Sequence, residues 1–373
     1  MKKSFIRRTA TYNGQALRFW AQAAFIALCL WIGIEFILWY GAHADGTTPL
    51  VTRPPGVEGF LPISALMSLW YFAQTGDFNM IHPAGTVILA AIVLMSIAFK
   101  KSFCSWLCPV GTISESLADL GKKLFTRNFK PWVWIDLPLR SLKYLMLAFL
   151  AYSVFVLMTP ADLRAFLESP YNRVADVKML LFFRDITRTA LIVIGVLMLG
   201  SLFIRGFWCR YLCPYGALLG LAGLLSPFRI TRNPDTCIDC AKCAKVCPSR
   251  IKVDTVKRVW SDECTSCMSC VEACPVADAL QLKAHRRSRF ELRTIHVAVG
   301  VVATFLLLTG GAMLAGAWQS SVSEEEYGRR IRDIDNPVYQ HHYGSAPSEN
   351  PGLPAEAASG APGGATPDAQ PHR

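Results

Sequence analysis

Twelve of the thirteen cysteines stand in four groups whose spacing is typical of metal or redox chemistry. Two groups follow the pattern CxxCxxCxxxCP, which occurs in bacterial proteins that carry two [4Fe–4S] clusters. In such proteins three cysteines of one group and the fourth cysteine of the other group hold each cluster. By that rule, the two predicted ligand sets are Cys237, Cys240, Cys243 and Cys274, and Cys264, Cys267, Cys270 and Cys247.

Zinc is the alternative to an iron–sulfur cluster, because CxxC pairs also occur in all-cysteine zinc sites. The third cysteine at a two-residue gap, the fourth followed by proline and the duplication of the whole pattern favour iron–sulfur chemistry. Four thiolates leave a cluster no open position for a substrate, so the segment is predicted to conduct electrons. The Lys and Arg side chains around it raise the cluster potential, dock an acidic partner, or only solvate the segment.

The other two cysteine groups form an internal repeat, in which KKSFCSWLCPVG resembles IRGFWCRYLCPYG. Cys104 with Cys108, and Cys209 with Cys213, are four residues apart, so on a helical turn both thiols share one face. If the apolar segments before the two copies pack together, the four thiols meet. They then bind a further metal or cluster, act as redox thiols, or pack as small apolar residues.

Five apolar segments are candidates to cross a membrane, which requires about 20 residues. This predicts an α-helical integral membrane protein of about five transmembrane helices, with an inserted α+β, bacterial-type two-cluster ferredoxin segment. The five segments are Leu17–Tyr40, Ala84–Phe99, Leu139–Met158, Arg188–Ile204 and Ile295–Trp318.

Most of the 38 Lys and Arg residues fall between these segments on one side, if the N-terminus is cytoplasmic. Cytoplasmic loops of membrane proteins carry such an excess. The formal charge of +11 is therefore a topology signal, and nucleic acid is not an expected partner. The expected location is the bacterial inner membrane, with the N-terminus and the cysteine-rich segment cytoplasmic and the C-terminal tail periplasmic.

The chain divides at the changes in composition. Residues 1–228 are predicted to form a membrane domain with four spans and both CxxxCP copies, and residues 229–290 the cytoplasmic ferredoxin-like domain. Residues 291–318 form the fifth span, and residues 319–373 an external, largely disordered tail rich in Pro, Gly, Ala and Ser.

Three side chains near the outer ends of the apolar segments are candidates for proton transfer. Glu58 and His82 could accept protons from a quinol, or be satisfied interfacial residues. Glu35 lies within the first apolar segment, where a carboxylate is costly unless it faces protein, water or the interface.

At this point the chain resembles the NapH-type membrane ferredoxins of periplasmic nitrate reduction, and the electron-transfer half of the NosR-type proteins of nitrous oxide respiration. The resemblance rests on RPPGVEGFLPISALM, HPAG, the two CxxxCP motifs and the duplicated cluster motif, over about residues 53–282. It implies an electron-relay subunit similar to a quinol dehydrogenase, which draws on the quinone pool. Its expected partner is a periplasmic reductase, a cytochrome c or a ferredoxin-type subunit.

A different class of function stays open at this point. CcoG-type proteins resemble this chain in clusters and spans, and act as membrane iron–sulfur reductases in the assembly of a metal or cofactor site. That family ends in a folded immunoglobulin-like domain, whereas the tail here is short and polar. The sequence therefore favours electron transfer to a terminal reductase.

Overall fold

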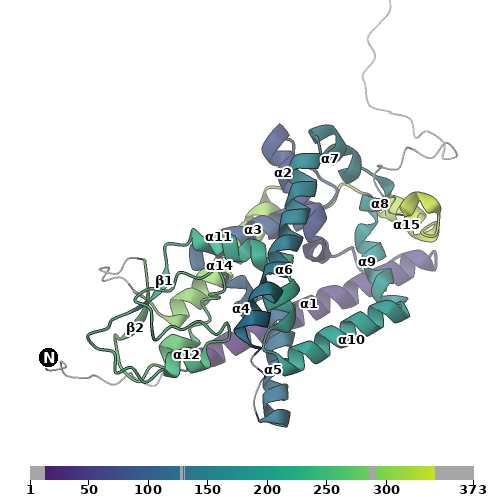
Figure 1. Ribbon diagram of the computed structural model, residues 1–373. Coiled ribbons are helices and arrows are strands. Elements are labelled where there is room, and N and C mark those ends of the chain that lie inside the picture. Colours follow the sequence, from purple (N-terminus) through teal and green to yellow (C-terminus); the bar gives the residue numbers. More distant parts are fainter. Residues whose placement is uncertain (1–12, 127–128, 130, 285–290, 341–373) are drawn as a thin grey trace, which may run out of the picture.

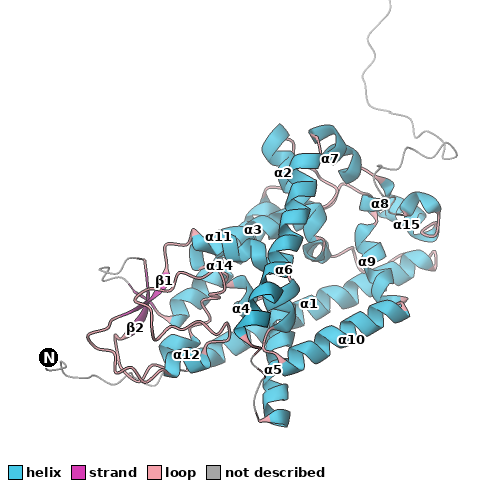
Figure 2. Cartoon of the chain, viewed as in Figure 1, coloured by secondary structure: helices cyan, strands magenta, loops and turns pink. Residues whose placement is uncertain are grey.

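The computed structural model describes residues 13–126, 129, 131–284 and 291–340 (Figure 1). Helices dominate the chain, and one small sheet lies at one end of the molecule (Figure 2). This confirms the helical class that the sequence predicts, with a small α+β segment inserted between helices.

Within the described residues, three helices are long and apolar enough to cross a membrane by length and composition. They are α1 (Gly14–Ala44), α6 (Val133–Tyr152, extended by a π turn over Ser153–Leu157) and α14 (Thr294–Leu314). A fourth candidate is the pair α9 (Ala175–Arg184) and α10 (Arg188–Phe203), which bends by 82° at its break.

The count of five predicted spans is therefore larger than the helix lengths establish. Helix α3 (Pro83–Phe99) has 17 residues and is shorter than the about 20 that a full crossing needs. It is also surrounded by protein, since Ala84, Ala91 and Met95 are fully buried. An apolar segment of this length is equally suited to a buried core helix, which hydropathy alone does not distinguish from a span.

In the CxxxCP repeat, the helices of one copy pack against the helices of the other copy. In each copy the apolar helix leads into the cysteine loop, and a second helix follows the proline: α5 (Pro109–Phe125) after the first loop and α11 (Pro214–Leu224) after the second. Helix α3 packs against α11, and α10 packs against α5. The close packing that brings the loops together thus differs from the direct pairing of α3 with α10 that the sequence suggests.

The remaining helices and turns are short, and together with the helices above they form the part of the chain outside the ferredoxin-like segment, which we call the membrane part. They are a 3₁₀ turn (Pro55–Phe60), α2 (Pro62–Thr75), α4 (Phe103–Trp106), α7 (Pro160–Leu167), α8 (Pro170–Arg173), a π turn (Trp208–Leu212), α15 (Glu324–Arg332) and a 3₁₀ turn (Pro337–Tyr339).

The ferredoxin-like segment is a three-stranded antiparallel sheet with two short helices. Strand β1 (Arg229–Arg232) pairs with β2 (Leu280–Lys283), which pairs with β3 (Glu291–Leu292). The helices are α12 (Lys242–Val246) and α13 (Ser269–Glu272). Ile230 and Leu282 of the sheet belong to the same buried apolar core as Trp106 and Val297 of the helices, so the segment is packed onto the membrane part.

Helix α1 connects two ends of the molecule (Figure 1). At its start, the Gln15 side chain donates a hydrogen bond to the Cys267 carbonyl at 3.1 Å. At its other end, His43 Nε2 lies 3.0 Å from Glu324 Oε2. A helix of 31 residues is about 46 Å long, which exceeds the thickness of the hydrocarbon core.

The segment after α14 corrects one expectation. Residues 319–340 are folded rather than disordered: Ser323 caps α15, and Tyr327 and Ile331 are buried against Trp39 of α1. The apolar side chains at 327, 331 and 334 recur at helical spacing within a charged sequence, and α1 supplies the surface that they need. The Pro-rich residues 341–373 lie outside the described residues.

Candidate functional site

The two CxxCxxC loops have the same backbone. Asp239 and Ala241 in the first loop, and Ser266 and Met268 in the second, all have a positive φ, between 46° and 61°. Alternation of left-handed and right-handed residues turns successive backbone N–H groups toward one point and forms a concavity for an anion. A positive φ is costly at Ala and Met, and such strain is concentrated at sites that bind a group.

Two small cavities lie beside these loops, and each is lined by four cysteines. Cys237, Cys240, Cys243 and Cys274 line one cavity, and Cys247, Cys264, Cys267 and Cys270 line the other. In each cavity, three thiols come from one motif and the fourth from the other motif, which is the grouping that the sequence predicts. Four thiols around a concavity of backbone N–H groups fit an iron–sulfur cluster.

The two cavities differ in their position relative to the membrane part. The loop of Cys264 to Cys270 is buried against the first CxxxCP loop: Ser105 Oγ donates to the Thr265 carbonyl at 2.9 Å, and Trp106 Nε1 to the Ser266 carbonyl at 3.2 Å. We call the Cys264 cavity proximal. The other cavity, which we call distal, is closer to the surface, since Cys240 is exposed.

The CxxxCP thiols do not share one continuous helix. Cys104 lies in α4, whereas Cys108 is extended (φ −62°, ψ 118°) and caps α5. Cys213 caps α11 in the same way (φ −75°, ψ 104°). The prolines that follow Cys108 and Cys213 disfavour a helical backbone at those cysteines, so each turn ends at its second cysteine. The N–H of Cys108 still donates to the Phe103 carbonyl at 2.9 Å, and that of Cys213 to the Trp208 carbonyl at 3.0 Å. The common face of each pair stays a prediction.

The four thiols are nevertheless close to one another. Cys104 and Cys209, from different copies, line one cavity of about 100 Å³. Burial raises the pKa of the Cys104 thiol well above its ordinary value, and neighbouring Cys108, Cys209 and Cys213 raise it further. Burial likewise raises the pKa of Cys108 to about 11 and that of Cys209 to about 12.

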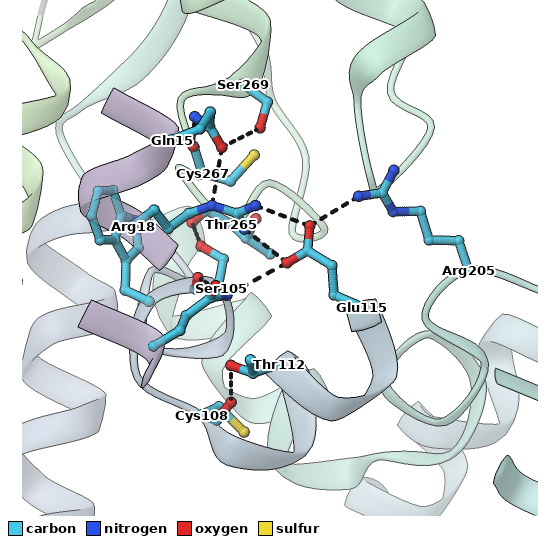
Figure 3. Close-up of polar contacts among 12 residues, drawn as sticks. Gln15, Arg18, Ser105, Cys108, Thr112, Glu115, Arg205, Thr265, Cys267 and Ser269 are labelled. Carbon is cyan, nitrogen blue, oxygen red and sulfur yellow. Dashed lines mark hydrogen bonds and ion pairs between the residues drawn. The ribbon is translucent and has the colours of Figure 1, made fainter. Parts of the chain in front are cut away.

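The start of α1 braces this region (Figure 3). Glu115 of α5 accepts two hydrogen bonds from Arg18, at 2.9 and 3.0 Å, and one from Arg205 at 2.9 Å. Arg205 directly precedes the second cysteine loop, so one carboxylate ties α1 to both copies of the repeat. Burial opposes the charge of Glu115, but the two guanidinium groups lower its pKa below the ordinary value.

Glu58 and His82 are brought together in a buried polar group that the sequence does not reveal, on the side of the molecule where the end of α1 contacts α15. Arg53 Nη1 donates to Glu58 Oε1 at 2.8 Å, and Arg53 Nε donates to Asp176 at 2.7 Å. His82 Nδ1 lies 3.5 Å from Glu58 Oε1, and all four side chains are buried. Tyr327 of α15 stacks against the Arg53 guanidinium.

Two buried carboxylates share one cation in this group of side chains. Glu58 and Asp176 face a single guanidinium, that of Arg53. His82 Nε2 lies 2.6 Å from the Asn172 carbonyl, which only accepts, so Nε2 carries the hydrogen. Buried charges are retained in proteins when they are paired in this way.

A large apolar cavity of about 790 Å³ extends from the first CxxxCP loop to Arg53. It lies between α1, α3, α14 and the segment before α2. Phe103 and Pro109, neighbours of Cys104 and Cys108, line one end of it, which we call the inner end, while Glu35 and Arg53 line the opposite end, which we call the outer end. Glu58 and His82 do not line it; they lie behind Arg53.

Four charged residues of these sites are not predicted from the sequence. Lys101 and Glu263 line the cavity of the CxxxCP thiols, and Arg53 and Asp176 pair across 123 positions of the chain. The available signals were the basic residues shortly before each cysteine loop and the Arg in RPPG, which read equally well as flanking charge.

Comparison with known proteins agrees with this description. A family model described as a 4Fe-4S binding domain matches residues 81–128 and 188–233, and one described as a 4Fe-4S dicluster domain matches residues 229–275. The first covers all four CxxxCP cysteines. No solved structure matches the chain.

Among curated relatives, the "Putative electron transport protein YccM" of Escherichia coli is 48% identical over 86% of this chain and 90% of its own length. The ferredoxin-type protein NapH of Escherichia coli is 26% identical over 54% of this chain and 60% of its own. The regulatory protein NosR of Pseudomonas aeruginosa is 31% identical over 39% of this chain and 20% of its own. These relatives confirm the resemblance described above: the chain belongs to the NapH- and NosR-type family of membrane ferredoxins, together with YccM.

Proposed function

We propose that this protein is a quinol-linked electron relay of the bacterial inner membrane, which takes electrons from quinol and passes them on toward a periplasmic reductase. The observation that carries this proposal is the 790 Å³ cavity, which joins a carboxylate and a guanidinium at its outer end to the CxxxCP loops at its inner end. Its volume lies within the range of pockets for drug-sized ligands, about 300–1,000 Å³.

The walls of this cavity suit a lipid-soluble ring compound. Leu28, Trp31 and Leu306 line it and are also largely exposed on the outside of the helices, where lipid would surround them. A quinol dissolved in the bilayer therefore has an entry between α1 and α14. Phe25 and Phe305 form an edge-to-face pair in the wall, at a centroid distance of 5.6 Å, which a ring can extend.

Oxidation of a quinol releases two electrons and two protons, and the cavity residues are suited to the protons. Glu35 lines the cavity and is the carboxylate that a quinol hydroxyl can reach. Arg53 is held by Glu58 and Asp176, so it can donate to a quinol oxygen without changing its position. Glu58 and His82 then act behind Arg53, as groups that hold or exchange one proton, rather than as direct acceptors.

The eight ferredoxin cysteines would hold two [4Fe–4S] clusters, which supply one-electron carriers when bound. The proximal set lies against the membrane part and the distal set near the surface. Exposed Lys242 and Lys245 flank Cys243 of the distal set along the chain and offer an acidic redox partner a docking surface.

The positions of the two ends support the orientation that the charges predict. The ferredoxin segment contacts the start of α1, and α15 contacts its end. If α1 crosses the membrane, these two parts lie on opposite sides. The excess of Lys and Arg then supports a cytoplasmic ferredoxin segment and a periplasmic α15.

The variant Glu35→Gln tests this proposal, because it keeps the shape of the side chain and removes the proton acceptor. We expect quinol to reduce the clusters about 100-fold more slowly in this variant, while dithionite still reduces them fully. Glu325→Gln, at an exposed carboxylate of α15, is the matched control and should leave both rates unchanged. Equal rates in Glu35→Gln and the native protein would contradict the role of this cavity.

A further inference from the structure

The proximal and distal cavities are surrounded by different charges, although their CxxCxxC loops share one backbone conformation. Asp239 and Asp254 line the distal cavity. Among the described residues, no charged side chain lines the proximal cavity. The reduction potential of an iron–sulfur cluster depends on hydrogen bonds to its sulfurs, on burial and on nearby charge. Because the two loops present their backbone N–H groups alike, burial and charge remain to distinguish the two potentials.

Lys100 is a buried cation beside the proximal set. It is only 1% exposed, and its Nζ donates a hydrogen bond to the Ser261 carbonyl at 3.1 Å, shortly before Cys264. In the described part of the chain, no carboxylate lies within ion-pair distance of this ammonium group. Burial lowers the pKa of Lys100, whereas a thiolate at Cys264 opposes that shift. A buried charge requires a partner of opposite sign, and the proximal set can supply it.

The carboxylates nearest to Lys100 are held by other groups. Glu263 faces both Lys101 and Lys143, and these two lysines are buried as well. Asp262 accepts a hydrogen bond from a tyrosine hydroxyl of α6. Three lysines therefore face two carboxylates, which leaves one positive charge in excess beside the proximal set.

The backbone at Lys100 is strained. Its φ of 60° and ψ of −161° fall in a region that is essentially confined to glycine. Helix α11 packs closely on this point, since a Cβ at Gly223 would lie 3.2 Å from Lys101 N and 3.3 Å from Lys100 Cα. Strain of this kind is concentrated at functional sites, so the conformation of Lys100 indicates a role beyond the end of α3.

Asp254 is the corresponding charge beside the distal set, with the opposite sign. Its Oδ1 is buried and accepts no hydrogen bond from the described residues. Burial raises the pKa of the Cys243 thiol, and the Asp254 carboxylate raises it further. Asp239 differs from Asp254, because it pairs with Arg232 at 3.0 Å. Asp254 therefore leaves an unpaired negative charge at the wall of the distal cavity.

We propose that Lys100 raises the reduction potential of the proximal cluster and that Asp254 lowers that of the distal cluster, so that the proximal cluster takes the first electron. Reduction adds one electron and makes a cluster more negative, which a nearby cation favours and a nearby carboxylate opposes. Burial of the proximal set acts against its reduction, but Lys100 is buried too, where salt screens its charge little. The first electron then stays at the membrane part, and this order does not depend on quinol as the donor.

Potentiometric titration of the full chain with dithionite, followed by EPR, tests this order. Cys243→Ser, which keeps the proximal signal, assigns the two signals, and we expect the proximal signal to appear first in the native protein. Lys100→Met keeps the length of the side chain and removes its charge. It should shift the sharing of the first electron about tenfold toward the distal cluster, which corresponds to about 59 mV. Asp254→Asn should shift it in the same direction, and Lys123→Met, at an exposed lysine of α5, is the control.

Two results would overturn this proposal. One is a distal signal that appears first in the native protein. The other is a set of midpoint potentials that neither Lys100→Met nor Asp254→Asn changes. A cation at the C-terminal end of α3 also stabilises that helix, but a purely structural role of Lys100 would alter the stability of the variant and leave the proximal midpoint in place. Asp254 is near the surface, so its variant tests the proposal even if Lys100→Met fails to bind its clusters.

Discussion

Trp106 of the first CxxxCP loop donates its indole hydrogen bond to the carbonyl of Ser266, within the second CxxCxxC loop. The two residues are 160 positions apart, and both are buried. Ser266 is one of the residues held at positive φ, so the bond fixes the strained backbone that surrounds the proximal set of cysteines. This contact makes the ferredoxin segment continuous with the membrane part.

Replacement of Trp106 by Phe should weaken this docking. The ring is largely kept, but the Ser266 carbonyl is left buried without its donor, which costs about 1–3 kcal/mol. Denaturation in detergent, followed by the loss of cluster absorbance, measures the change. Trp20→Phe, at an exposed ring of α1, is the control. Equal stability of the two variants would show that the indole bond contributes nothing to docking.

Replacement of Cys243 by Ser should affect the distal set alone. Cys243 lines only the distal cavity, so the variant should lose about four iron while the EPR signal of the proximal cluster remains. Cys267→Ser is the reciprocal variant and should remove the proximal signal. Loss of both signals in both variants would mean that the segment folds only when it is fully loaded.

The ferredoxin part of this site was predictable because its ligands carry a local signature, namely cysteine spacing. The buried polar group of Arg53, Glu58, His82 and Asp176 was not predictable, because a pair such as Arg53 with Asp176 leaves no pattern along the chain. Helix α3 has the apolar composition of a transmembrane helix, whereas its burial by neighbouring helices is a property of packing that composition does not reveal. Residues 319–373 are predicted as a largely disordered tail, and the fold of residues 319–340 does not follow from their sequence because α1 supplies the apolar surface on which they pack.

Replacement of Arg53 by Gln should be strongly destabilising. It leaves Glu58 and Asp176 buried together without their shared cation, and breaking a buried ion pair costs about 3–5 kcal/mol. Thermal unfolding in detergent measures the loss. Arg164→Gln breaks the exposed pair with Glu168 and should leave the unfolding midpoint unchanged. A small effect at Arg53 would mean that water reaches this cluster.

Acid should weaken the bracing of α1 through Glu115. Arg18 and Arg205 lower the pKa of this carboxyl in the folded protein, so its contribution is complete above the unfolded pKa, about 4.3. The contribution is lost as the pH falls through the lower, folded value. Glu115→Gln should therefore show a smaller loss of stability below about pH 4 than the native protein. Parallel acid profiles for the two proteins would contradict this.

Reporter fusions test the orientation. A reporter inserted near Lys257 should be cytoplasmic, and one fused after Arg373 should be periplasmic, because the two parts contact opposite ends of α1. Both reporters on the same side of the membrane would require an even number of crossings between them. That result would contradict α14 as the single span between the two positions.

The most direct test of quinol-linked electron relay is potentiometric EPR on membranes that contain the full chain, first with added quinol and then with a low-potential cytoplasmic reductant. Our proposal predicts that quinol alone reduces the iron–sulfur signals, and that Glu35→Gln slows this reduction without altering the signals that dithionite produces. Signals that stay oxidised with quinol and appear only with the cytoplasmic reductant would contradict it, and would show that electrons enter from the ferredoxin side.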